Sequence, residues 1–282
     1  MQTFKSIKSL LSSLRIDARK FQIVYLGLFL ILGTFFLDWG TEGAKVSLVI
    51  GTALFTQFIF ILLGKAHAHS WMSAMITALG LCLLFRANEV STLMMAASLA
   101  IASKFLLKKN GKHLFNPANF GIVICILFTS DGWVSPGQWG SSMVFLFMIA
   151  ALGSIVLLRV GRLDTTLTFL LVFVALEYCR SVLYLGWSHD VLIHRFTNGS
   201  FLLFAFFMIT DPKTTPDHPR SRIIWAVSVA LLSFILSTQL YLHTAPIWAL
   251  FFITPLNALL DSAIQGKRFQ WLSEQEFKPH IS

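Results

Sequence analysis

Long apolar runs separated by short polar segments dominate this sequence of 282 residues. Inside a lipid bilayer every backbone N–H and C=O must find its partner within the protein, so only helices and closed barrels cross it. The strands of a transmembrane barrel would appear as alternating segments of about ten residues. Here the runs are continuous, and only 12% of the residues are charged. The sequence therefore predicts an all-α, polytopic membrane protein.

The apolar runs divide into about ten predicted transmembrane spans. They cover residues 21–38, 46–64, 71–86, 90–107, 118–131, 142–159, 163–186, 197–211, 222–240 and 245–262. The connecting loops are short, which predicts one compact bundle without a soluble domain. We expect residues 1–20 to form an amphipathic cytoplasmic segment, 21–262 the transmembrane domain and 263–282 a cytoplasmic tail.

The basic residues are unevenly divided between the two predicted sides of the membrane. With the N-terminus inside, 18 of the 22 basic residues lie in inner segments; the outer segments hold only Lys45, Arg86, Arg180 and Arg195. This asymmetry is typical of a bacterial-type inner (cytoplasmic) membrane protein with both termini in the cytoplasm. It also accounts for the net charge of +9 without a nucleic-acid partner.

Two predicted spans are too short to cross a hydrocarbon core of about 30 Å as plain helices. They are Phe120–Ser130 and Phe201–Thr210, and an offset of 81 residues aligns them, pairing Thr129 with Thr210. The two spans are three apart and cross in opposite directions, which predicts an internal inverted repeat. Short interrupted helices in such repeats mark binding sites near the middle of the membrane. A chance alignment of two Phe-rich helices is the alternative.

The polar start of each short span is a candidate ligand site. Asn116 is a predicted helix cap, and Pro117 fits the first turn, where its missing N–H does no harm. An interrupted helix start presents free backbone N–H groups and the positive end of the helix dipole. An anionic or acceptor-rich ligand, such as a flavin, a phosphate or a quinone carbonyl, suits that arrangement. A simple turn between two helices is the structural alternative.

Other polar residues have structural alternatives of equal or greater weight. Glu177 and Arg180 lie three residues apart in one span, where they are either functional or paired on one helix face. His67 and His69 lie on a loop, where such a pair seldom binds metal. The three cysteines have no Cys-x-x-Cys spacing and are predicted to be simply buried, so no metal site is expected. The absence of a P-loop argues against an ATP-driven pump.

Two motifs point to a known family. The first is Gly111-Lys112-His113-Leu114-Phe115-Asn116-Pro117-Ala118-Asn119-Phe120-Gly121, and the second is Phe207-Met208-Ile209-Thr210-Asp211-Pro212-Lys213-Thr214-Thr215-Pro216. Their order and their places at the ends of short helices resemble the NqrB/RnfD family. Those proteins are the membrane subunits of the sodium-translocating NADH:quinone oxidoreductase and of Rnf electron-transport complexes. The ten-helix plan with internal pseudo-symmetry agrees as well, so the resemblance covers most of the chain.

The resemblance implies an electron-transfer subunit of an oxidoreductase, with FMN near the outer face of the membrane. In classical members a Thr of a Ser/Thr-Gly-Ala-Thr motif carries the flavin through a phosphoester. This sequence lacks that motif, and residues 132–140, near its expected place, hold only Ser135 close to their middle. We therefore expect a divergent member in which the flavin is bound without a covalent bond.

The flavin is expected between the two halves of the repeat. The candidate residues are Lys104, Lys112, Asn116, Pro117, Asn119, Asp131, Ser135, Asn198, Thr210 and Asp211. Lysines and backbone N–H groups would neutralise a phosphate, and Asn side chains would bind the ring edge. The expected partners are other membrane or soluble redox proteins and the lipid bilayer, in a homo- or hetero-oligomer. Two alternatives stay open: a channel or carrier for a small polar solute, and a scaffold that anchors redox partners without a cofactor.

Overall fold

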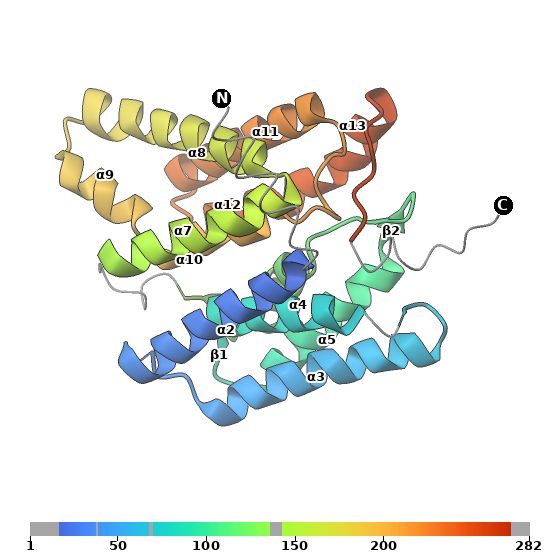
Figure 1. Ribbon diagram of the computed structural model, residues 1–282. Coiled ribbons are helices and arrows are strands. Elements are labelled where there is room, and N and C mark those ends of the chain that lie inside the picture. The colour runs from blue at the N-terminus through green and yellow to red at the C-terminus, as the bar shows by residue number, and fades with distance from the viewer. Residues whose placement is uncertain (1–16, 38, 68–69, 136–142, 272–282) are drawn as a thin grey trace.

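The computed structural model describes residues 17–37, 39–67, 70–135 and 143–271. These residues form helices packed side by side, with two short antiparallel strand pairs among them (Figure 1). The predicted all-α class is confirmed, and the apolar helices fit a membrane protein. His69 and most of the predicted amphipathic segment and C-terminal tail lie outside the described residues.

The first half of the described chain contains the helices α2 (Ala18–Phe36), α3 (Gly43–Leu62), α4 (Trp71–Leu84), α5 (Val90–Leu106) and α6 (Pro117–Thr129). Strand β1 (Phe85–Ala87) follows α4 and pairs antiparallel with β4 (Gly132–Val134). Strands β2 (Lys108–Lys109) and β3 (Lys112–His113) form a hairpin between α5 and α6.

The second half contains α7 (Met143–Val160), α8 (Leu163–Tyr178), α9 (His189–Phe196), α10 (Gly199–Leu203), α11 (Pro219–Gln239), α12 (Ala245–Ile253) and α13 (Asn257–Ala263). Helix α8 continues into the π-helix η2 (Cys179–Tyr184), and α10 continues into the π-helix η3 (Phe204–Met208). A single 3-10 turn, η4 (Thr254–Leu256), joins α12 to α13.

Each predicted span coincides with a helix or with consecutive helical segments, whereas α9 is an additional short helix. By length and composition, five helical stretches of the described chain can each cross a bilayer: Ala18–Phe36, Gly43–Leu62, Leu163–Tyr184, Pro219–Gln239 and Ala245–Ala263. A sixth candidate is His189–Phe196 with Gly199–Met208, bent by 55°. The other predicted spans coincide with shorter apolar helices, so the count of ten stays a prediction.

The loops gather at two opposite ends of the bundle. At one end, called the basic end, lie the start of α2, the β2–β3 hairpin, the α7–α8 turn, residues 209–218 and residues 264–271. Lys112 of the hairpin binds Asp217 and Asp261, with Nζ to carboxylate oxygen distances of 3.1 and 2.7 Å. The Arg19 guanidinium lies 4.9 Å from the ring centroid of Trp271. These contacts join segments that are far apart in the sequence.

The other end, called the opposite end, holds the alternate loops. Strand β1, between α4 and α5, pairs there with β4, between α6 and α7. The Asp131 carboxylate accepts hydrogen bonds from the backbone N–H groups of Asn88 (3.3 Å) and Glu89 (3.1 Å). Consecutive helices therefore run alternately between the two ends. Helix α4 is only about 21 Å long at 1.5 Å per residue, and β1 carries the chain onward from its last turn.

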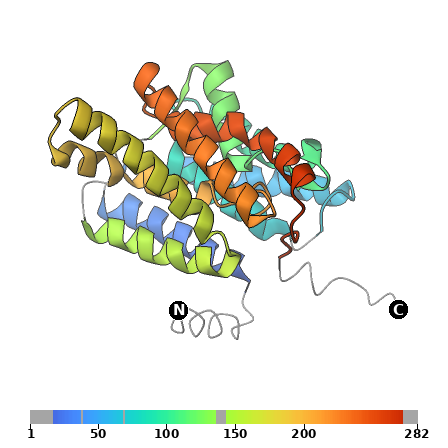
Figure 2. The same cartoon turned by 90° about the horizontal axis from the view of Figure 1, so that it is seen from above.

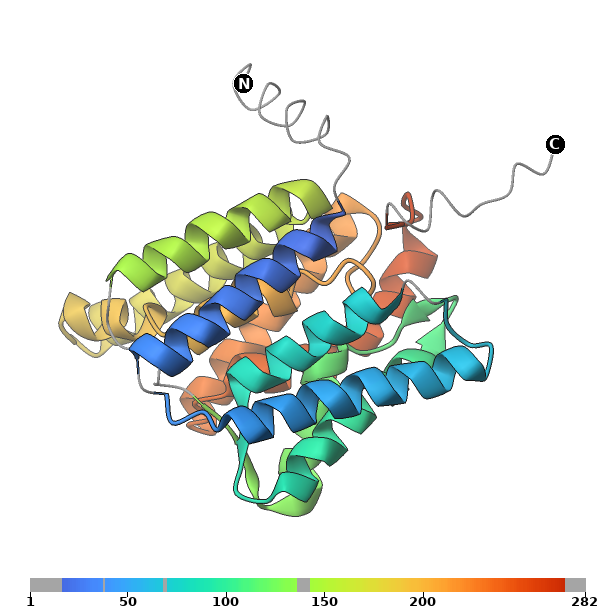
Figure 3. The same ribbon diagram turned by 60° about the horizontal axis from the view of Figure 1, so that its bottom comes forward.

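The two halves repeat one packing pattern. Helix α3 packs against α4 and α5, α5 against α6, and α2 against α4. In the second half α8 packs against η3 and α11, α11 against α12, and α7 against α10 and η3. The halves meet where α2 lies beside α7 and where α6 contacts α12. Figures 2 and 3 show the first of these pairs, the blue α2 next to the yellow-green α7.

Candidate functional site

A large cavity of about 900 Å³ opens at the opposite end of the bundle. It lies between η2, α9, the start of α10, the end of α11 and the start of α12. Its lining includes Phe173, Arg180, Trp187, His194, Arg195, Phe196, Asn198, Phe201, Phe204, Ser237, Tyr241 and His243. Cavities that bind cofactors commonly measure about 300–1,000 Å³ and combine apolar walls with a few polar groups. The large cavity has both properties.

One buried carboxylate lies behind the wall of the large cavity. Glu177 is fully buried, and its Oε2 accepts a hydrogen bond from Nη1 of Arg195 at 2.9 Å. Its other oxygen accepts from the Ser237 hydroxyl at 3.0 Å. The predicted alternative in which Glu177 pairs with Arg180 on one helix face is wrong, because the ion pair reaches across to Arg195 of α9. Among the described residues, Arg180 forms no ion pair.

Aromatic rings form one wall of the large cavity. Phe173 of α8 lies edge-on to Phe196, with 5.8 Å between the ring centroids, and stacks with Phe201 at the same distance. Phe196 and Phe201 are 5.2 Å apart. Such clusters exclude water and leave flat apolar surface for a planar ligand.

Both π-helices border the large cavity. Helix η2 carries Arg180, and η3 begins with Phe204. A π-turn adds one residue to a helical turn and redirects the side chains around it, and such turns are frequent at functional sites. The two irregular segments therefore both contribute side chains to this cavity.

A second, small cavity of about 90 Å³ opens at the basic end, between α2, α4, α6, α7 and η3. Its polar lining includes Ser73, His113, Asn116, Thr210 and Asp211. Lys104 lies behind Ser73 and donates from Nζ to its carbonyl oxygen at 2.9 Å. Asn116 caps α6 and also donates to the Met208 carbonyl at 3.2 Å. Because one water occupies about 30 Å³ of liquid, this space suits a few waters or a small solute.

Burial governs the ionisation of the loop groups at the small cavity. It raises the pKa of the Asp211 carboxyl, opposed by a hydrogen bond from the Lys213 backbone and by the positive charge of Lys104. Burial, together with the charges of Lys104, Lys108 and Lys213, lowers the pKa of His113 to about 3. His113 is therefore neutral near pH 7, and its Nδ1 lies 3.0 Å from the Lys104 carbonyl oxygen.

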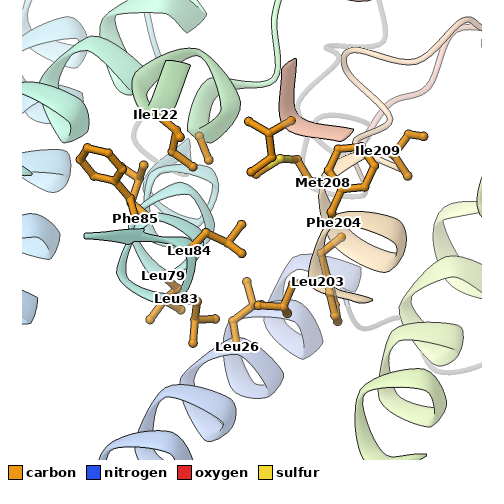
Figure 4. Close-up of a cluster of buried hydrophobic side chains, with 14 of the residues drawn as sticks. Leu26, Leu79, Leu83, Leu84, Phe85, Ile122, Leu203, Phe204, Met208 and Ile209 are labelled. Atoms are coloured by element: carbon orange, nitrogen blue, oxygen red, sulfur yellow. The ribbon is translucent and has the colours of Figure 1, made fainter. Parts of the chain in front are cut away.

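A cluster of buried apolar side chains, called the apolar layer, borders both cavities. Figure 4 shows its side chains directed toward one space between α2, α4 and η3: Leu26, Leu83, Leu84, Leu203, Phe204 and Met208. All six are buried. The consecutive residues Leu203 and Phe204 line different cavities, the small one and the large one respectively. The cavities thus approach each other from opposite ends of the bundle.

The predicted site residues lie in separate places and do not surround one pocket. The structure brings Asn116, Pro117, Thr210 and Asp211 together around the small cavity, with Lys104 behind Ser73. Asn119 lies elsewhere and donates to the Ile247 carbonyl of α12 at 2.8 Å. Lys112 belongs to the ion-pair cluster with Asp217 and Asp261. Asp131 binds the α4–α5 loop, and Ser135 donates its backbone N–H to the Leu84 carbonyl at 2.9 Å.

Only Asn198 of the predicted set lines the large cavity, where its side chain caps α10 by accepting from the Ser200 N–H at 3.0 Å. The prediction missed Trp187, Tyr241 and His243 as lining residues. The sequence did contain a signal for this cavity, because two of its lining residues, Arg180 and Arg195, are among the only four basic residues on the predicted outer side.

A comparison with protein families matches residues 129–270 to the NQR2, RnfD, RnfE family. This chain belongs to the NQR2/RnfD/RnfE family. The second predicted motif, Phe207–Pro216, lies within the matched segment, and the first, Gly111–Gly121, precedes it. Every residue that lines the large cavity falls inside the segment, whereas α2, α4 and most of α6, which contribute to the small cavity, lie outside it. No curated protein matches this family member.

Proposed function

We propose that this NQR2/RnfD/RnfE protein is a membrane electron-transport subunit that holds FMN in the large cavity. The observation that carries the proposal is the cavity itself: about 900 Å³, lined by cations and aromatic rings and built wholly from the segment matched to the family. The small cavity, at about 90 Å³, is too small for the three-ring flavin system. The structure thus favours a flavin at the end of the bundle opposite the basic loops.

The side chains of the large cavity fit a flavin without a covalent bond. Arg180, Arg195 and the polar start of α10 offer donors for a phosphate, and Phe173, Phe196 and Phe201 would cover the ring and exclude water. Bound FMN supplies the capacity to accept and release electrons singly or in pairs. Ser135, the expected hydroxyl near the missing Thr motif, is buried directly after β4 and donates its backbone N–H to Leu84 at the end of α4. Its neighbour Val134 lines the cavity instead.

The arrangement of the two cavities supports electron transfer along the bundle axis. Phe204 lines the large cavity, and Leu203, its neighbour in the chain, lines the small cavity. A flavin held in the large cavity would lie next to the apolar layer, which also borders the polar groups of the small cavity. Redox partners at the basic end are part of this proposal, since the described chain contains no soluble domain to receive electrons.

We also propose that ten spans form an inverted repeat of five and five. The alternation of the loops between the two ends supports the number, and the matched packing of the halves supports the repeat. In that packing pattern α6 of the first half corresponds to α12 of the second, and α4 corresponds to α10–η3. It therefore favours a different pairing from the sequence offset of 81, which aligned α6 with α10.

An absorption spectrum of the detergent-purified protein, taken before and after acid precipitation, tests the flavin. We expect flavin bands in the folded protein and release of the colour into the acid supernatant. Colour in the pellet would show a covalent bond and refute non-covalent binding. A protein that is colourless, and stays so after incubation with FMN, would refute the flavin site. Solute flux into liposomes would then favour the channel alternative.

A further inference from the structure

Arg180 is a half-buried cation without an acidic neighbour. It lines the large cavity from η2, and among the described residues it forms no ion pair. The acid nearest to it in sequence, Glu177, is occupied by Arg195 and Ser237. A partly desolvated guanidinium that lacks a counter-charge is unfavourable in the absence of a ligand.

The charge of the large cavity has one sign. Its described lining contains Arg180 and Arg195 as cations and no Asp or Glu. Glu177 neutralises Arg195 from behind the wall, at 2.9 Å, which leaves the charge of Arg180 unbalanced. A ligand that fills this cavity is therefore expected to bring a negative group close to Arg180.

We propose that Arg180 binds the phosphate of the ligand, so that the cavity selects a phosphorylated flavin over the uncharged riboflavin. This inference rests on the proposed flavin site. A guanidinium offers two parallel N–H donors to a phosphate and stays charged at every physiological pH. The ion pair takes the place of the covalent attachment for which this chain lacks the residues. Arg195 contributes less to selection, because Glu177 already holds one of its donors.

Selection is measured by titrating flavin-stripped protein in detergent with FMN and, separately, with riboflavin, following the loss of flavin fluorescence. For the unaltered protein we expect FMN to bind at least about tenfold more tightly than riboflavin. Arg180→Gln should weaken FMN binding to the level of riboflavin and leave riboflavin binding unchanged. Arg180→Lys keeps the charge but loses the paired donors, so its affinity for FMN should lie between those of the unaltered protein and Arg180→Gln. Lys45→Gln, at the same end but beside Glu42, should leave both affinities as they are.

Equal affinities for FMN and riboflavin in the unaltered protein would overturn the role of Arg180 and leave the flavin site standing. Binding of neither flavin would overturn the proposed function itself. A second measurement needs no variant: inorganic phosphate at millimolar concentration should weaken the binding of FMN and lower the tenfold preference. An Arg180→Gln protein that melts like the unaltered one and still prefers FMN would also refute the inference.

Discussion

At the scale of single residues, the two partners of the Glu177–Arg195 ion pair are buried to different extents. Glu177 is fully buried, whereas the Arg195 side chain is 38% exposed. Arg195→Ala should therefore cost about 3 kcal/mol of stability, because it strands a buried charge. Glu177→Gln should cost less, since the freed guanidinium can reach water and the amide still accepts from Ser237. Thermal unfolding of both single variants and the double variant gives the coupling energy. Equal losses in the two single variants would contradict this asymmetry.

His113 makes stability depend on pH. Its pKa in the folded protein, about 3, lies below the usual 6.5, because burial and the nearby charges of Lys104, Lys108 and Lys213 disfavour the cation. The unfolded chain therefore takes up the proton first, and stability falls as pH drops below 6.5. At pH 5 the loss is about 2 kcal/mol. His113→Gln should remove that part of the loss between pH 7 and pH 5, measured by unfolding in detergent. His189→Gln, an exposed control, should not.

A local role of a polar residue could be predicted from the sequence, whereas a long-range partner could not. Asn116 is the predicted cap of α6, because capping is a local property of Asn followed by Pro and a helix. The partner of Glu177 was not predictable in this way. Arg195 is 18 residues further along the chain and lies on α9, a short helix that is not marked by an apolar run in the sequence. Contacts across a turn of unknown geometry depend on the whole fold.

At the scale of elements, Gly121 sets how closely α5 and α6 approach. A Cβ at this position would lie 2.5 Å from the Ala96 carbonyl oxygen and 3.0 Å from the Ala100 Cβ. Small residues allow such close packing of helices in membranes. Gly121→Ala should cost about 1–3 kcal/mol, because the helices must separate. Gly51→Ala, where a Cβ meets nothing within 4 Å, should instead stabilise α3 by about 0.5–1 kcal/mol. Melting temperatures that move in the same direction would contradict this reading.

Helix boundaries were predictable because apolar runs and turn residues mark them. Predicted spans such as 71–86 and 90–107 differ from α4 and α5 by only one or two residues. The β1–β4 pair was not predicted, since three residues of extended chain leave no periodic signal. The π-turns in η2 and η3 were equally invisible, because one added residue in a helix changes neither its composition nor its apolar character.

At the scale of the whole molecule, the alternation of the loops predicts which residues lie on the same side of the membrane. Cysteines placed at Lys109 in the hairpin and at Ser188 before α9 should react from opposite sides in a Cys179→Ser background. A membrane-impermeant maleimide should label Ser188→Cys in intact spheroplasts and Lys109→Cys only after permeabilisation. Labelling of both in intact spheroplasts would contradict ten spans.

The apolar layer that borders the two cavities has an electrical consequence. Wherever water fills the open part of a cavity, its high dielectric constant lets little of the membrane voltage fall across that part. The voltage then concentrates across the apolar layer, where Leu203 lines one cavity and Phe204 lines the other. It does not spread evenly over a hydrocarbon core of about 30 Å. A charge that crosses this layer then does most of the work of crossing the whole membrane, about 2.3 kcal/mol for each 100 mV. Under the proposed function, substitutions that hydrate the layer should make electron flow less sensitive to voltage.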